Sequence, residues 1–246
     1  MEIEPDVIVV GGGIAGLIAA LEAARAGASV ELHESHGSVG GRAGTRSVAG
    51  FRFNQGAHAF YLKGAFGQAL DRLQVNVTGA APNFQSALAV VGERMELIPF
   101  SPTAIARTGL LDDRERQAMA SSIRALLGDV APEPGESVAR FLDRIGAVGT
   151  VRAVLEALVR LTTYCHAPER FDAVAAVRQV QLGFKGVIYV DNGWSALVDA
   201  LCRAAGAAGV DIRTASAAAL VEPAGDGVVT RFYDGGARRS QTVVLA

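Results

Sequence analysis

The stretch VIVVGGGIAGLIAALEAARAGASVELHE, residues 7–34, decides the fold. Val7 to Val10 form a short β-branched run of the kind that lies buried in a parallel sheet. After the glycines, apolar residues recur at helical spacing between Ile14 and Leu21, and Gly27 is a typical helix stop. Residues 28–33 then have strand character. The stretch therefore predicts one strand–helix–strand unit with parallel strands.

The glycine cluster after the first strand has the pattern G-x-G-x-x-G, placed directly after a strand and before a helix. In this context Gly11 allows a tight turn, Gly13 lets the backbone approach a pyrophosphate, and Gly16 lets the helix pack closely on the strand. The free N–H groups at the helix start, around Ile14 and Ala15, would face the phosphates. The cluster predicts the phosphate site of a dinucleotide.

Glu34 ends the second strand, 23 residues after Gly11. An acidic side chain at this place accepts hydrogen bonds from a ribose 2′-hydroxyl and argues against a cofactor with a 2′-phosphate. The alternative is a strand-end carboxylate that faces water, but the glycines favour ribose binding. The flanking His33 and His36 are expected on the surface near the adenosine.

A second glycine pair, Gly40-Gly41, precedes Arg42. The glycines permit backbone conformations closed to other residues, and the Arg42 guanidinium can pair with phosphate oxygens. The surrounding residues 35–56 are rich in glycine and serine, which predicts a loop with little regular structure.

The rest of the chain predicts an α/β fold with a helical interruption. A hairpin is expected at 87–98, followed by helices at 112–127, 138–145, 148–163 and 171–181. Strand character returns at 187–190, a helix follows at 194–205, and strands are expected at 211–213, 217–221, 227–233 and 239–245. We expect a Rossmann-like domain built from residues 1–83 and 186–246, with a mainly helical substrate domain at 84–185.

Composition narrows the class of protein. The net charge of −2 is spread along the chain without a basic stripe, which argues against a nucleic-acid partner. No apolar run approaches the roughly 18 residues that a membrane-spanning helix needs. Cys165 and Cys202 lack metal-ligand spacing, so we expect free thiols, no metal site and a cytoplasmic location.

The combination of GGGIAGL, the strand-end Glu34 and Gly40-Gly41-Arg42 resembles the flavin amine oxidase superfamily, which includes monoamine oxidases, protoporphyrinogen oxidases and phytoene desaturases. The resemblance implies noncovalently bound FAD. Residues 53–58 are similar to the family segment beside the flavin ring, which would place Gly56 and Ala57 there, although the family commonly has Asp at Asn54. Residues 218–222 resemble the strand whose backbone, at Ala218, meets the adenine.

The resemblance implies oxidation of a small organic molecule by the flavin, with residues 56–62 more similar to the desaturase and protoporphyrinogen oxidase side and hence to an apolar substrate. Catalytic residues are unknown; His58 and Tyr61 are candidates, with a structural role as the alternative. An amine or amino-acid oxidase of the same superfamily, and a non-catalytic binding protein like the Rab GDP-dissociation inhibitors, stay open. The family's second half is absent, so we expect a truncation or a second polypeptide that supplies it.

Overall fold

The computed structural model describes residues 4–56 and 58–246. The chain divides into two compact units. The first consists of Met1–Phe60, Ala65–Ala80 and Ile188–Ala246, and the second of Tyr61–Gly64 and Ala81–Val187. The chain therefore leaves the first unit and later returns to it.

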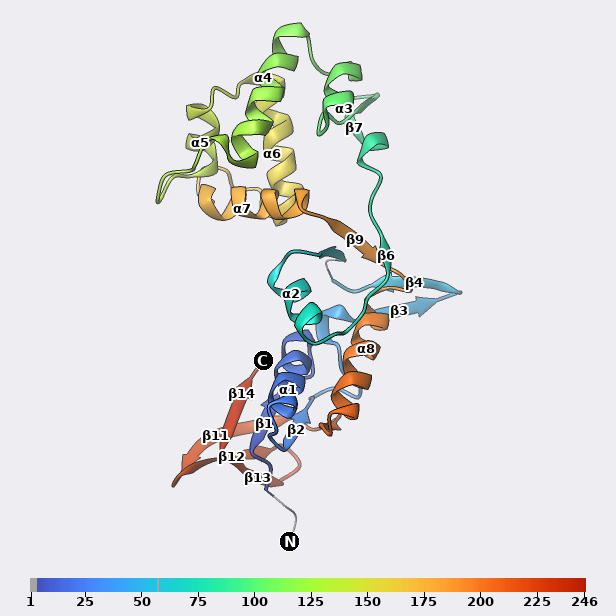
Figure 1. Ribbon diagram of the computed structural model, residues 1–246, viewed down its shortest axis with the longest axis vertical. Helices are drawn as coiled ribbons and strands as arrows, with labels where there is room; N and C mark the ends of the chain where they lie inside the picture. Colours follow the sequence, from blue (N-terminus) through green and yellow to red (C-terminus); the bar gives the residue numbers. More distant parts are fainter. Residues whose placement is uncertain (1–3, 57) are drawn as a thin grey trace. The chain divides into compact units, whose positions relative to one another are not determined.

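A parallel sheet forms the centre of the first unit. Its strands are β1 (Val7–Val10), β2 (Val30–His33), β10 (Asp211–Arg213) and β14 (Thr242–Leu245), in the order β10-β2-β1-β14. Helices α1 (Ile14–Arg25) and α8 (Trp194–Ala207) lie side by side next to it (Figure 1). This arrangement confirms the α/β fold with a parallel, Rossmann-like sheet.

The apolar stripe of α1 explains why this helix packs here. Leu17 and Leu21 are fully buried, and they share one hydrophobic cluster with Val9 and Leu32 of the sheet and with Leu201 of α8. Because β1 and β2 pair in parallel, with Val10 beside His33, their carboxyl ends reach the same edge of the sheet. The residues that follow these two strands, Gly11 and Glu34, are therefore brought together.

A three-stranded antiparallel meander follows β10. It consists of β11 (Ala218–Ala224), β12 (Gly227–Phe232) and β13 (Ala237–Ser240). The expectation of one strand over 239–245 is wrong, because the chain changes sheets at Gln241. The N–H groups of Gln241 and Thr242 both donate to the Asp6 carbonyl, at 3.1 and 3.0 Å, and this contact starts β14 beside β1.

The expectation of an irregular loop over 35–56 is also wrong. The segment contains a short 3₁₀ helix (Gly41–Ala43) and a hairpin of β3 (Thr45–Val48) with β4 (Phe51–Asn54). The two-residue turn has positive φ at both Ala49 (49°) and Gly50 (82°), which is the geometry that matches strand twist in tight hairpins. Ala-Gly is a weak turn signal because alanine seldom adopts positive φ.

The second unit is mainly helical, as the sequence predicts. Its helices are α3 (Pro102–Arg107), α4 (Asp113–Arg124), α5 (Val138–Arg144), α6 (Gly149–Thr163) and α7 (Ala173–Phe184), with a π-helical turn at Ala125–Asp129. They pack around a cluster that includes Met119, Phe141, Leu142 and Leu155. A hairpin of β7 (Leu88–Val91) with β8 (Arg94–Leu97) precedes them. The short α3 carries too little periodicity to be predicted from sequence.

The remaining elements connect these parts. They are α2 (Ala65–Arg72), a 3₁₀ turn at Phe84–Ser86, and the three-stranded sheet β5-β9-β6 made of Ala59–Tyr61, Val187–Val190 and Gly79–Ala80. Over the described residues, no helix combines the length and the hydropathy needed to cross a bilayer.

The packing of α8 gives a stability prediction. Leu201 has no exposed surface and lies in the cluster shared with α1. Leu201→Ala leaves a cavity and is expected to lower the free energy of unfolding by about 2–5 kcal/mol. Urea denaturation measures this, with Arg203→Ala, at the next exposed position of α8, as the control. A loss below about 1 kcal/mol would show that α8 does not pack as described.

Candidate dinucleotide-binding site

The carboxylate of Glu34 holds the loop after β1. Only 7% of the residue is exposed, and its Oε2 accepts from the Gly12 N–H at 2.7 Å. The second oxygen, Oε1, accepts from the His36 N–H at 2.8 Å and from the Ser35 hydroxyl at 3.0 Å. The His36 ring nitrogen Nδ1 lies 2.9 Å from the same oxygen. Glu34 is therefore fixed by its neighbours and does not simply face water.

These hydrogen bonds keep Glu34 ionised. Burial by itself raises the pKa of a carboxyl group, but the bonds from His36, Gly12 and Ser35 stabilise the charged form. Together they lower the pKa of Glu34 from 4.5 to about 2. At neutral pH the site therefore presents a full negative charge, which suits an acceptor for sugar hydroxyls.

The three motif glycines have distinct geometries. Gly11 has φ +110°, a conformation that side chains disfavour, and a Cβ at Gly16 would collide with the Gly11 carbonyl oxygen. A Cβ at Gly13 would meet nothing within 4 Å. Gly13 is also the N-cap of α1, and no side chain caps this helix end. The start of α1, where Ala15 is exposed and Ile14 half-buried, thus has N–H groups available next to open space.

The second glycine pair lies against the first motif. The Gly40 N–H donates to the Gly12 carbonyl at 2.8 Å, and Gly13 and Gly40 form a parallel bridge. Gly40 and Gly41 have φ of +113° and +51°, so this contact relies on glycine. Arg42 follows at an exposed position. The structure thus brings Gly40, Gly41 and Arg42 to the motif glycines.

Gly56 lies beside the same segment, because a Cβ on it would come within 2.6 Å of the Arg42 carbonyl oxygen. Ala57 lies outside the described residues. The exposed His58 contacts the Tyr189 ring, with centroids 5.3 Å apart, and its carbonyl accepts from the Trp194 indole N–H at 3.0 Å. The Tyr61 hydroxyl donates to the Thr162 carbonyl at 3.2 Å. Both candidates therefore make contacts of a structural kind.

Asn54, where the resemblance leads to an expected Asp, has a clear function in the fold. Its Oδ1 accepts from the Trp194 N–H at 3.0 Å and from the Thr45 hydroxyl at 2.8 Å. The Thr45 oxygen in turn accepts from the Ser195 N–H at 3.0 Å. The hairpin side chains thus cap α8, whose own N-cap Gly193 has no side chain. An amide oxygen suffices for this contact.

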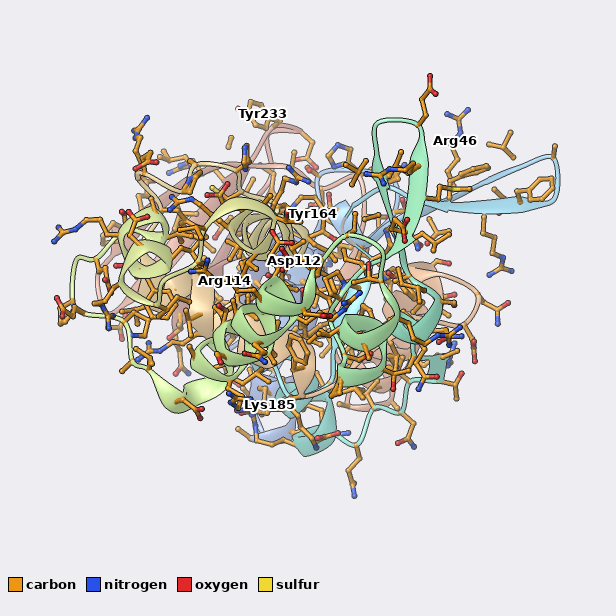
Figure 2. The ribbon with its side chains drawn as sticks, turned by 90° about the horizontal axis from the view of Figure 1, so that it is seen from above. Arg46, Asp112, Arg114, Tyr164, Lys185 and Tyr233 are labelled. Carbon is orange, nitrogen blue, oxygen red and sulfur yellow. The ribbon has the colours of Figure 1, made fainter. Side chains whose placement is uncertain are left out.

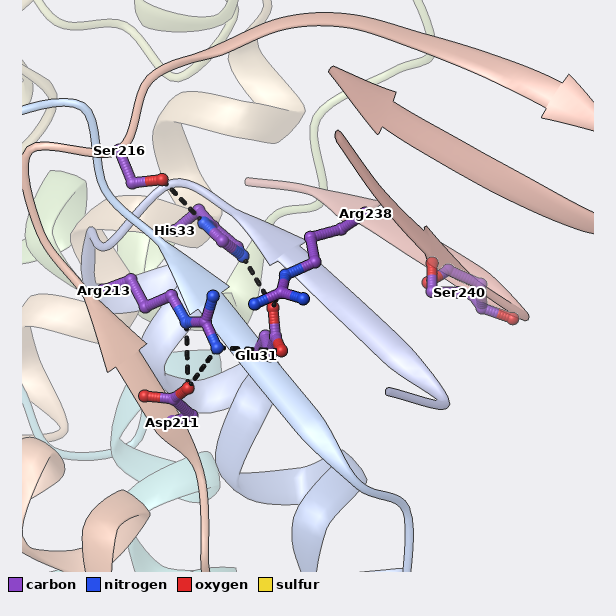
Figure 3. A network of polar contacts seen from close by, with 8 residues as sticks. Glu31, His33, Asp211, Arg213, Ser216, Arg238 and Ser240 are labelled. Carbon is purple, nitrogen blue, oxygen red and sulfur yellow. Dashed lines mark hydrogen bonds and ion pairs between the residues drawn. The ribbon is translucent and has the colours of Figure 1, made fainter. Parts of the chain in front are cut away.

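A polar network centred on Glu31 and His33 involves the strand that Glu34 follows (Figure 3). The Glu31 carboxylate contacts His33 Nε2 at 3.1 Å, Arg213 at 3.1 Å and Arg238 at 3.5 Å. His33 Nδ1 lies 2.8 Å from the Ser216 hydroxyl. Through the main chain, Glu34 N–H donates to the Arg213 carbonyl and Ser216 N–H donates to the Glu34 carbonyl, both at 2.8 Å. The network thus fixes the segment beside Glu34.

The expectation that His33 lies on the surface is wrong. Only 2% of it is exposed, and its ring lies against Phe232 with centroids 4.4 Å apart. Burial, helped by the nearby charge of Arg213, lowers the pKa of His33 below its usual value, although Glu31 and Asp211 act in the opposite direction. The ring is therefore neutral at physiological pH. His36, by contrast, has an exposed side chain.

Several members of the site carry no sequence signal of their own. Gly12 occupies a variable position of the motif, and Ser35 and Ser216 belong to no pattern. Ala218 begins β11 two residues after Ser216, which places it on the segment that borders Glu34. Over the described residues, no group of three or more His, Cys, Asp or Glu side chains could hold a metal ion.

Known proteins resemble this chain in sequence and in fold. Residues 6–110 match the sequence profile of the family described as FAD dependent oxidoreductase. A carotenoid 3,4-desaturase from Haloarcula japonica is 49% identical over 61 residues, which are 25% of this chain and 12% of that protein.

Solved structures share the fold across nearly the whole chain. Putrescine oxidase with bound putrescine superposes with a TM-score of 0.69 at 20% identity, covering 99% of this chain and 58% of that one. A Rab GDI from Plasmodium falciparum gives a TM-score of 0.67 at 11% identity, covering 98% and 65%. The chain thus spans less than two thirds of the length of these proteins.

The fold, with its parallel sheet and glycine loop at the strand ends, is that of the Rossmann-like dinucleotide-binding class. Residues 6–110 are thus similar to the FAD-dependent oxidoreductases, and the chain shares its fold with an amine oxidase, which supports FAD as the cofactor. The structure fits the adenosine-diphosphate part of FAD, because an ionised carboxylate, an uncapped helix N-terminus and the open space at Gly13 lie at one edge of the sheet.

The pKa of Glu34 gives a pH prediction. Since folding lowers this pKa from 4.5 to about 2, the contribution of the carboxylate is fully present above pH 4.5 and is lost as the pH falls toward 2. The difference in unfolding free energy between the wild type and Glu34→Gln should therefore shrink over this range in urea titrations. Glu93→Gln, at an exposed turn, is the control. A difference that stays constant with pH would contradict the account.

Proposed function

We propose that this chain supplies the FAD-binding part of an oxidoreductase that desaturates or oxidises an apolar organic molecule. The observation that carries the proposal is the buried, ionised Glu34 hydrogen-bonded to the motif glycine loop. A carboxylate held in this way accepts from the ribose hydroxyls of FAD, for which the exposed His36 side chain can make room.

Each residue of the site has a proposed role. The N–H groups from Gly11 to Gly16, with Ile14 and Ala15 at the helix start, donate to the pyrophosphate, and the helix dipole favours its charge. Gly40 and Gly41 let the backbone pass close to the phosphates, and Arg42 pairs with them. Gly56 lies along the flavin ring, and the main chain at Ala218 contacts the adenine.

The bound cofactor supplies the chemistry by taking two electrons from the substrate. The residues of this chain supply orientation. The hydrogen bonds of Asn54 and Thr45 to the start of α8 fix the hairpin that precedes Gly56. The Glu31–His33 network fixes the strand that precedes Glu34. We propose no catalytic acid or base among them, since the His58 ring lies against Tyr189 and the Tyr61 hydroxyl donates to a main-chain carbonyl.

An apolar substrate is supported by the helical unit. A cavity of about 750 Å³ lies within this unit, a volume that suits a small molecule. Its lining is mainly apolar and includes Phe100, Ile105, Ile123, Leu127 and Phe184. The short match to a carotenoid desaturase points in the same direction. An amine oxidase remains the alternative enzyme, because putrescine oxidase shares the fold of nearly the whole chain.

A non-catalytic binding protein is the other alternative, since a Rab GDI shares the fold. The complete set of nucleotide-binding features favours a flavoprotein over this function. We place the protein in the cytoplasm, with a small molecule and no nucleic acid as its partner, because Cys165 and Cys202 are both free thiols and the charge shows no basic stripe.

Gly13 offers a direct test of FAD binding. Its φ suits any residue and a Cβ would meet no protein atom, so Gly13→Ala should leave the free energy of unfolding without ligand nearly unchanged. The methyl group would, however, occupy the approach of the pyrophosphate and weaken FAD binding at least about tenfold. Calorimetric titration with FAD measures this, and Gly206→Ala on α8, also in open space, is the matched control. Equal FAD affinity in Gly13→Ala would remove the pyrophosphate from this loop.

We also propose that turnover requires a further part of the fold, carried either on the same polypeptide or on a second one. The β7–β8 hairpin supports this requirement. Leu88 and Val90 pair with Leu97 and Met95, so all four share one face. Val90 is 72% exposed and Met95 69%, an apolar surface that soluble proteins rarely leave uncovered.

Co-expression tests this requirement. These 246 residues alone are expected to retain FAD but to show no turnover, and turnover should appear when the complementary half of a related desaturase is supplied. Retained flavin absorbance and substrate consumption are measured in parallel. Full turnover by the isolated chain would refute the requirement for a further part, whereas loss of flavin would count against the proposed cofactor site.

A further inference from the structure

The β3–β4 hairpin is an arm with two unlike faces. Strand pairing places Thr45 opposite Asn54 and Ser47 opposite Arg52, so these four polar residues share one face. That face contacts the start of α8 and the residue before its N-cap. Asn54 and Thr45 cap α8, and Arg52 donates to the Asn192 carbonyl at 2.8 Å. The arm is therefore held in place by its polar side.

The opposite face is apolar and open. Pairing places Arg46 opposite Phe53 and Val48 opposite Phe51. Phe51 is 68% exposed, Phe53 57% and Val48 44%. The tight turn at Ala49-Gly50 brings Val48 and Phe51 together at the tip. Figure 1 shows the arm extending sideways past the start of α8, and Figure 2 shows its side chains, Arg46 among them, reaching away from the ribbon.

All formally charged residues in the segment around this hairpin are basic. No acidic residue occurs between Glu34 and Asp71, although the whole chain has a net charge of −2. Arg46 lies on the apolar face itself, and Arg52 lies on the neighbouring strand β4, opposite Ser47 on the polar face; both are exposed. Arg52 is bound to a main-chain carbonyl and not to a carboxylate, so its charge is not neutralised by that contact.

The hairpin tip thus combines exposed aromatic side chains with arginines and lacks carboxylates. This combination suits the surface of a lipid bilayer. Apolar side chains enter the boundary between headgroups and acyl chains, while basic groups are attracted to anionic headgroups. A protein partner that covered Phe51 and Phe53 would gain electrostatic attraction from this basic segment only if the partner's own surface were acidic. The combination of both features favours a lipid surface.

We propose that the exposed face of the β3–β4 arm, formed by Arg46, Val48, Phe51 and Phe53, binds the surface of a bilayer that contains anionic lipids. The phenylalanines insert shallowly and Arg46 contacts lipid phosphates. The attachment is peripheral and reversible, because only one short hairpin enters the interface. It depends on the geometry of the hairpin and not on the proposed oxidoreductase function.

The test is co-sedimentation of the FAD-loaded chain with vesicles of phosphatidylcholine alone and of phosphatidylcholine mixed with phosphatidylglycerol. The wild type should bind the mixed vesicles and bind the neutral vesicles much more weakly. Phe51→Ser combined with Phe53→Ser should lower the affinity for mixed vesicles at least about tenfold, and Arg46→Ala about fivefold. Tyr233→Ser, which removes a 79% exposed aromatic ring from the β12–β13 turn, should have no effect.

A spectroscopic measurement guards against misfolded variants. Trp194 is the only tryptophan, so Phe51→Trp adds a single reporter at the tip. Its emission should shift to the blue when mixed vesicles are added, and the wild type should show no such shift. Absence of wild-type binding to mixed vesicles, equal binding by the double serine variant, or no shift from Phe51→Trp would each overturn the proposal. Self-association that the double variant abolishes would overturn it in favour of a second copy of the chain.

Discussion

The hydrogen bond between the Glu34 carboxylate and the Gly12 N–H is the contact on which the rest of the site depends. It joins the end of β2 to the turn after β1, at an edge that the parallel pairing of these strands has already created. Gly12 is buried against Glu34, and a Cβ on it would come within 2.9 Å of the Glu34 Cβ. The turn can therefore close on the carboxylate only if this residue is glycine. The closed turn then presents the uncapped start of α1 and receives Gly40.

The arrangement around Glu34 also explains how a buried charge is tolerated. A carboxylate in this position is costly unless hydrogen bonds compensate for lost water, and Glu34 has donors on both oxygens. Behind it, the Glu31 charge is compensated by Arg213 and Arg238, and the neutral His33 connects Glu31 to Ser216. The Glu34 carboxylate can therefore face a ligand, whereas the Glu31 carboxylate is engaged in ion pairs that stabilise the surrounding chain.

Sequence patterns predicted those parts of the fold that are determined by the apolar spacing within a single helix or strand. The apolar spacing of α1, the strand before Gly11 and the helices α4 to α7 of the second unit follow from periodicity. Contacts between distant segments were not predictable in this way: the break at Gln241 depends on the Asp6 carbonyl, more than 200 residues away. The β3–β4 hairpin is local, but it depends on positive φ at Ala49, which alanine does not signal. At the site, the motif indicated Gly11, Gly13, Gly16 and Glu34. The contacts of Ser35 and His36 with Glu34 are local but belong to no sequence pattern. The Ser216 contact arises only because β10, which precedes Ser216, lies beside β2.

The most direct test of the central claim is the FAD affinity of this chain with and without the Glu34 carboxylate. Calorimetric titration of FAD into the wild type and into Glu34→Ala should show a loss of roughly 1.5–3 kcal/mol of binding free energy, the value of hydrogen bonds to a charged group. NAD, titrated in parallel, should bind far more weakly than FAD to the wild type. Equal FAD affinity in the two proteins, or tighter binding of NAD, would contradict the account.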